Sequence, residues 1–86
     1  MNPRYSYVAD ASVVEAFSDC TRREREHLLR TFALLAESSN QRGEWFRRTC
    51  SGRELQVKRF GKWLITYWPD RPVLEVRIVD VERIVA

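Results

Sequence analysis

The chain of 86 residues has few of the residues that interrupt or cross-link structure: three glycines, three prolines and two cysteines. Together with a hydrophobic fraction of 44%, this excludes a disordered chain and predicts one small folded domain over residues 1–86. Cys20 and Cys50 are too few and too far apart to suggest a metal site. We therefore expect two reduced thiols, with a disulfide between them as the alternative.

Several function classes are excluded by patterns that the sequence lacks. No apolar run approaches the length of a membrane span and no signal peptide opens the chain, which predicts a cytoplasmic protein without a membrane partner. There is no glycine-rich phosphate loop and no cluster of His, Cys, Asp and Glu, so we expect neither a metal nor a cofactor. The single histidine, His27, is interpreted as an ordinary helix residue and not as a catalytic base.

The last third of the chain consists of three runs rich in β-branched and aromatic residues. They cover residues 53–60, 62–68 and 73–81, with Gly61 and a proline-containing turn at residues 69–72 between them. Such runs with turn residues between them are typical of strands. Because short connections favour antiparallel pairing, the three runs predict an antiparallel meander.

Alternation within these runs assigns their side chains to two faces of the sheet. In the first run Val57 points away from Lys58, and in the last run Val76 and Ile78 point away from Arg77. If the apolar residues of both runs share the buried face, Lys58 and Arg77 lie together on the open face.

Two helices are predicted before the meander. Residues 4–8 alternate like a short strand at the sheet edge, and a first helix starts at Asp10 or Ser12 and ends near Cys20. Thr21 and Glu24 have the spacing of a capping box, which predicts a second helix that runs to about residue 38.

The second helix has a stripe of small and apolar residues at helical spacing. Its predicted buried residues are Leu28, Leu29, Phe32, Leu35 and Ala36. We expect this stripe to pack on the meander, with contacts to Val57, Ile65 and Val76. Residues 44–50 fit either an extra strand or an extended loop.

Positive charge is concentrated between Arg42 and Lys62. This stretch has seven basic and two acidic side chains, a net charge of +5, whereas the whole chain has a net charge of +3. Trp45, Phe46, Phe60 and Trp63 lie within it or beside it. Basic and aromatic residues in one stretch indicate a polyanion or an acidic protein as partner, and a solvated basic edge is the alternative.

The order strand, helix, helix and terminal meander resembles the RelE/ParE superfamily of toxins from toxin–antitoxin modules. The resemblance lies in residues 53–57, Gly61, the run Trp63–Tyr67 and the valine-rich last strand. It implies an α+β fold in which a small curved antiparallel sheet packs on two N-terminal helices, in the order β-α-α-β-β-β. RelE-type members cleave messenger RNA on the ribosome without a metal, whereas ParE-type members inhibit DNA gyrase, and an antitoxin neutralises both.

The resemblance also implies roles for particular residues. RelE-type cleavage needs a group that accepts a proton and cations that stabilise the charge developing on the phosphate. Arg77 and Arg83 would stabilise this charge, and Lys58 would stabilise charge or transfer a proton. The residues expected to bind the flanking RNA are Arg47, Arg48, Arg53 and Lys62.

Two positions depart from the family pattern. Leu64 stands where the middle strand often has an arginine, and the final residues 83–86 include no tyrosine. Tyr67 is interpreted as a core aromatic residue.

Three functions follow as hypotheses. The first is a RelE-like endoribonuclease, an mRNA interferase whose partners are an acidic antitoxin, the ribosome and mRNA. The second is a ParE-like gyrase inhibitor without chemistry, which the two departures favour. The third is a small nucleic-acid-binding domain without toxicity.

Overall fold

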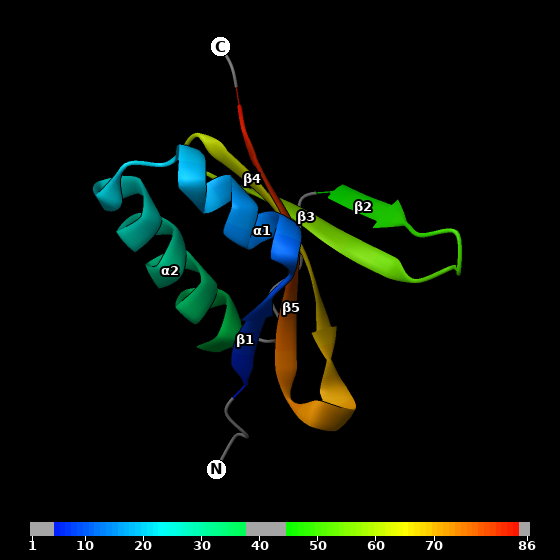
Figure 1. Ribbon diagram of the computed structural model, residues 1–86. Helices are drawn as coiled ribbons and strands as arrows, with labels where there is room; N and C mark the ends of the chain where they lie inside the picture. Colours follow the sequence, from blue (N-terminus) through cyan, green and yellow to red (C-terminus); the bar gives the residue numbers. More distant parts are fainter. Residues whose placement is uncertain (1–4, 38–44, 85–86) are drawn as a thin grey trace.

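The computed structural model describes residues 5–37 and 45–84, and Figure 1 shows two helices beside a twisted sheet. The elements, in chain order, are β1 (Ser6–Ala9), α1 (Ala11–Ala16), η1 (Phe17–Asp19), α2 (Arg22–Glu37), β2 (Trp45–Arg48), β3 (Glu54–Phe60), β4 (Trp63–Asp70), η2 (Arg71–Val73) and β5 (Glu75–Arg83). The predicted α+β class is confirmed, and the segment that fitted either a strand or a loop forms strand β2.

The five strands form one sheet in the order β1-β5-β4-β3-β2. The meander β3-β4-β5 is antiparallel as predicted, and β2 extends it as a further antiparallel strand. The expectation of a wholly antiparallel sheet is wrong, because β1 pairs with β5 in parallel, with Ser6 opposite Glu75. The argument from short connections does not apply to this pair, since most of the chain separates the two strands.

The starts of both helices follow the local sequence. Asp10 is the N-cap of α1, and its backbone carbonyl accepts hydrogen bonds from the N–H groups of Val13 and Val14. At α2, the Glu24 N–H donates to Thr21 Oγ1 over 3.1 Å, and the Thr21 N–H donates to Glu24 Oε1 over 2.9 Å. This reciprocal pair confirms the predicted capping box.

The core lies between the helices and one face of the sheet. Its buried residues are Val13, Leu28, Phe32 and Leu35 from the helices and Trp63, Ile65, Tyr67, Val76, Ile78 and Val81 from strands β4 and β5. Leu29, predicted to be buried, is 40% exposed, whereas Thr31 is buried. The helix turns by about 100° per residue, so the stripe centred on Leu28, Phe32 and Leu35 lies closer to Thr31 than to Leu29, which is left at its margin.

The pairing register defines two faces of the sheet, since directly opposite residues point to the same side. The helix-covered face carries the core residues of β4 and β5, together with Phe60, which lies opposite Trp63. The open face carries Val57 and Thr66, which lie opposite each other. The expected contact between α2 and Val57 is therefore wrong, although Val57 is buried.

The length of the β3–β4 turn explains this error. Gly61 and Lys62 form a two-residue turn, in which Gly61 has the positive φ of 61° that glycine adopts readily. With Phe60 opposite Trp63, the register brings Val57 opposite Thr66 and not Ile65. A shift of one residue would exchange the faces of the whole strand.

Strand β5 contains one residue more than β4 over the same span. Thr66 lies opposite Asp80 and Tyr67 lies opposite Ile78, so Val79 is an extra residue at a β-bulge. The Val79 carbonyl accepts a hydrogen bond of 3.1 Å from the Ser12 hydroxyl, which links the start of α1 to β5.

Candidate functional site

A pocket of about 540 Å³ lies between three segments: the start of α2, the β3–β4 turn and the end of β5. We call it the basic pocket, and it is lined by Thr21, Arg23, Glu24, His27, Lys62, Trp63 and Arg83. It combines cations, one carboxylate, one imidazole and one aromatic ring. Such a set can hold an anion and can move a proton.

Strand pairing brings two cations to this pocket. Trp63 begins β4 and lies opposite Arg83, the last residue of β5, while Lys62 precedes Trp63 in the turn. The Ile84 N–H donates to the Lys62 carbonyl over 2.7 Å, which extends the pairing past the end of β5. Both cations also lie beside the Trp63 ring, with Arg83 Cζ 4.9 Å and Lys62 Nζ 5.8 Å from its centroid.

Glu24 binds both cations with one carboxylate oxygen. Its Oε2 lies 2.8 Å from Lys62 Nζ and 2.8 Å from Arg83 Nη2. The pKa of Glu24 is lowered to about 2, chiefly because Lys62 donates a hydrogen bond to the carboxylate and next because the Thr21 N–H does. Glu24 is therefore ionised at neutral pH and acts both as a helix cap and as a counter-ion.

Lys58 lies on the same face of the sheet as Arg83. Lys58 is opposite Ile65, a core residue of the helix-covered face, and its Nζ is 5.4 Å from the centroid of the Phe60 ring. Two of the three predicted catalytic residues, Lys58 and Arg83, therefore share a face.

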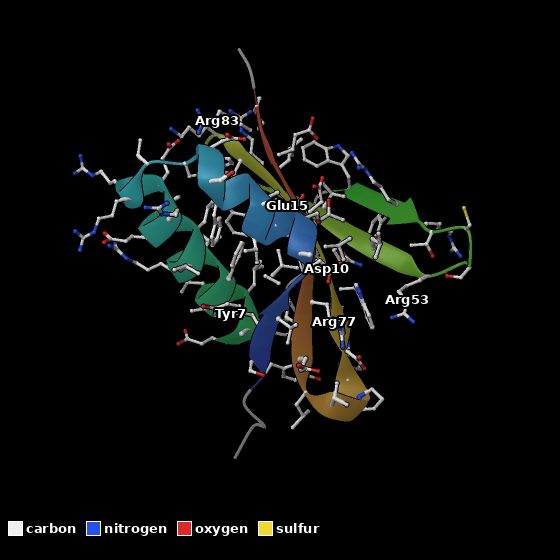
Figure 2. All side chains as sticks on the ribbon, viewed as in Figure 1. Tyr7, Asp10, Glu15, Arg53, Arg77 and Arg83 are labelled. Carbon is white, nitrogen blue, oxygen red and sulfur yellow. The ribbon has the colours of Figure 1, made fainter. Side chains whose placement is uncertain are left out.

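Arg77, the third predicted catalytic residue, lies on the other face, so its expected grouping with Lys58 is wrong. It is opposite Trp68 on the open face, and its guanidinium carbon is 6.0 Å from the Trp68 ring centroid. Arg77 also pairs with Asp70 over 3.6 Å and with Glu75 over 3.9 Å. Figure 2 shows Arg77 and Arg53 at a distance from Arg83. The register of β3 causes the difference, because it turns Lys58 toward the helix-covered face.

The four residues predicted to bind RNA do not form one stripe. Lys62 lies in the basic pocket, whereas the Arg53 guanidinium carbon is 3.7 Å from the Trp68 ring centroid on the open face. Arg47 lines a second, mostly apolar groove with Trp45, Phe46, Val57 and Leu64. Arg48 lies opposite Glu54, on the other side of β2 from Arg47.

Arg23, Glu24 and His27 line the pocket but were not predicted as site residues, and His27 was interpreted as an ordinary helix residue. It lies three residues after Glu24 on α2, so both side chains face the same side of the helix. The spacing was visible in the sequence. Nothing local to α2, however, indicates that the end of β5 lies beside it.

Comparison with known proteins identifies the fold. No protein-family profile and no curated protein matches this chain. In the RelBE2 toxin–antitoxin complex from Mycobacterium tuberculosis, a chain matches with a TM-score of 0.76 and 17% identity, over 94% of this chain and 99% of that one. In the RelE–RelB complex from Pyrococcus horikoshii OT3, a chain matches with a TM-score of 0.72 and 14% identity, over 94% and 96%.

This chain has the RelE fold. The fold predicted from the order of elements is confirmed. In this fold, Leu64 lies opposite Arg59 and Glu82 on the open face and lines the same mostly apolar groove as Arg47. An arginine at position 64 would therefore lie on the opposite face from Lys58 and Arg83.

Tyr67 occupies a core position of the RelE fold, as predicted. It is 3% exposed, and burial raises the pKa of its hydroxyl. A buried Tyr67 therefore cannot make up for the tyrosine that residues 83–86 lack.

Neither a metal site nor a membrane span is found in the described part of the chain. Within residues 5–37 and 45–84, no three His, Cys, Asp or Glu side chains lie close enough together to hold a metal ion. Over the same ranges, no helix has the length and apolar character needed to cross a membrane.

Proposed function

We propose that this chain is the toxin of a toxin–antitoxin module and inhibits translation by cleaving mRNA on the ribosome. The observation that carries this proposal is the meeting of Lys62 and Arg83 at one carboxylate oxygen, in a chain with the RelE fold. An oxygen held by two cations at 2.8 Å has the surroundings that a phosphate oxygen requires.

The reaction that fits this site is attack of an RNA 2′-hydroxyl on the adjacent phosphate. The O2′–P bond forms as the P–O5′ bond breaks, a base accepts the 2′ proton, and the 5′ oxygen takes up a proton as it leaves. Arg83 stabilises the charge that develops on the phosphate oxygens, and Lys62 binds the same phosphate or its neighbour. Lys58, on the same face, stabilises charge or transfers a proton.

Arg77 has no catalytic role in this proposal, since it lies on the open face and pairs with two carboxylates. Arg47, Arg48 and Arg53 instead contact phosphates of the flanking mRNA or of the ribosome. Such contacts add affinity that depends on salt but not on sequence.

The proposed partner in the module is an acidic antitoxin. The two similar structures are both toxin–antitoxin complexes. Strand β2 is an edge of the sheet, and its Trp45 and Phe46 are 50% and 54% exposed beside Arg47 and Arg48. An edge with apolar and basic side chains suits a protein segment that carries apolar residues and carboxylates.

Inducible expression followed by two separate readouts tests the proposal. We expect growth arrest, a fall in protein synthesis, and purified protein that cleaves mRNA only when ribosomes are present. Growth arrest with intact mRNA and loss of DNA supercoiling would replace this function by gyrase inhibition. Normal growth with both processes intact would instead leave a nucleic-acid-binding domain without toxicity.

A further inference from the structure

The strongest unexplained feature is the carboxylate that fills the cation pair of the basic pocket. Lys62 and Arg83 come from the β3–β4 turn and from the end of β5, yet both reach the same Glu24 oxygen. We propose that Lys62 and Arg83 form a binding site for a phosphate group, and that Glu24 is an internal occupant which the phosphate must displace.

The contact geometry supports a site shared by two anions. Both distances to Glu24 Oε2 are 2.8 Å, within the range of charge-assisted hydrogen bonds. The Lys62 and Arg83 side chains are 55% and 45% exposed, so a ligand can reach both from solvent. Trp63 is only 4% exposed, so its ring supports the two cations and is not available to stack on a base.

The charge of the pocket also favours an external anion. Arg23, Lys62 and Arg83 line it together with a single carboxylate, that of Glu24. These four side chains have a net charge of +2 when all are ionised, so one carboxylate leaves the cations incompletely neutralised.

Glu24 can leave the cations without loss of the helix start. Its Oε1, not Oε2, accepts the Thr21 N–H, and the Thr21 hydroxyl independently accepts the Glu24 N–H. Lys62 and Arg83 are about half exposed, whereas the Glu24 side chain is 13% exposed, so solvent screens the two ion pairs mainly from the side of the cations, where a ligand would approach. A phosphate with further charged neighbours along an RNA strand can therefore compete.

Release of Glu24 depends on competition and not on protonation. The pKa of Glu24 is lowered to about 2, chiefly by the hydrogen bond from Lys62, so the carboxylate stays ionised at neutral pH. Binding of a phosphate must therefore supply the energy that separates Glu24 from the two cations.

This inference rests on the proposed function only in taking mRNA as the source of the phosphate. A free phosphate ion has the same chemistry, so the experiment uses two probes: inorganic phosphate and a short RNA whose 2′-hydroxyls are methylated to prevent cleavage. Their affinities are measured by calorimetry at one fixed ionic strength, without ribosomes.

The deciding variant is Glu24→Gln, with Glu26→Gln as its control. In glutamine an amide oxygen replaces the carboxylate Oε1 as acceptor of the Thr21 N–H, so the capping box remains while the competing charge is lost. Glu26 is on the same helix and pairs with Arg22 outside the pocket. Glu26→Gln therefore changes the net charge of the chain by the same amount as Glu24→Gln, but not inside the pocket. A thermal melt confirms that both variants fold.

We expect Glu24→Gln to tighten binding of at least one probe by about two- to fivefold or more, since an ion pair near the surface contributes about that much, and Glu26→Gln to have a smaller effect. A gain for RNA alone assigns the site to the polynucleotide, and a gain for inorganic phosphate alone assigns it to the free ion. Adding Arg83→Gln to Glu24→Gln should remove the gain.

Equal affinities of the Glu24→Gln and Glu26→Gln variants for both probes would overturn the inference. The result is independent of the proposed function, because it is measured without ribosomes. A wild-type protein that fails to cleave mRNA removes the proposed function, yet a gain in Glu24→Gln would still establish the phosphate site.

Discussion

Arg53 stacks over the ring of Trp68, with 3.7 Å between its guanidinium carbon and the ring centroid. Arg53 immediately precedes β3, whereas Trp68 belongs to β4, so the contact links the two strands on the open face of the sheet. Arg77 lies on the same ring from a third element, β5, at 6.0 Å.

Replacing Arg53 tests this contact. Because a cation held over a tryptophan face contributes about 0.5–1 kcal/mol at an exposed site, Arg53→Ala should lower the free energy of unfolding by that amount. Urea denaturation followed by Trp fluorescence measures it. Arg53→Lys, which keeps the charge but not the planar group, should lose less, and equal losses would contradict a charge-based contact.

Replacing Phe32 tests the packing of α2 on the sheet. Phe32 is fully buried in the core cluster, so Phe32→Ala should cost about 3–5 kcal/mol of the free energy of unfolding. Leu34→Ala is the matched control on the same helix, since Leu34 is 58% exposed and should change stability by less than about 0.5 kcal/mol. Similar melting temperatures for the two variants would remove the helix-on-sheet assignment.

A comparison of Arg83 and Arg77 tests which face performs the proposed chemistry. The two arginines are similarly exposed, at 45% and 38%, and both make ion pairs, so they are a matched pair. Arg83→Ala should lower turnover of ribosome-bound mRNA by about a hundredfold, because a charge-stabilising donor is lost. Arg77→Ala should leave turnover within about twofold, since surface substitutions away from a site have small effects. The reverse order would move the site to the open face.

A cation introduced at position 64 makes a further test of the two faces. Leu64→Arg restores the residue type that the family often carries in the middle strand. We expect no gain in mRNA cleavage, because Leu64 lies on the open face with Arg59 and Glu82. Cleavage by quantitative primer extension, compared with Leu64→Met as a neutral substitution, checks this. Increased cleavage by the arginine variant alone would argue for a site that spans both faces.

The lowered pKa of Glu24 predicts a dependence of stability on pH. In the folded chain this pKa is about 2, below the ordinary value of 4.5, so the ionised carboxylate stabilises the fold. This contribution is fully present above about pH 4.5 and is lost as pH falls toward 2. The stability difference between wild type and Glu24→Gln should therefore be constant from pH 7 to 5 and should shrink below pH 4.5. A difference that does not change down to pH 3 would contradict the ion-pair assignment.

Features set by neighbouring residues were predictable from the sequence. The capping box of Thr21 and Glu24 follows from a spacing of three residues, and the meander follows from its turns. The buried tyrosine at position 67 follows from alternation in a strand that is apolar on both sides. Each of these depends on contacts within a short stretch of chain.

Features set by the register between strands were not predictable in the same way. Alternation shows that Lys58 and Arg77 each point to the other face of the sheet from their apolar neighbours along the strand. It does not show which of the two faces the helices cover. The two-residue turn at Gly61 and Lys62 decides this for β3. The basic pocket was missed for a related reason, because His27 and Arg83 meet only through the packing of α2 against the end of β5.

The β-bulge at Val79 adds one residue to β5 without changing how the strand pairs with β4 on either side of the bulge. Ile78 stays opposite Tyr67 below the bulge, and Arg83 stays opposite Trp63 above it. A chain without Val79 could keep both pairings and form a regular strand, losing mainly the acceptor that holds Ser12. Deletions at this one position should therefore be tolerated by the pocket and the core alike, and relatives that differ by one residue there can share both.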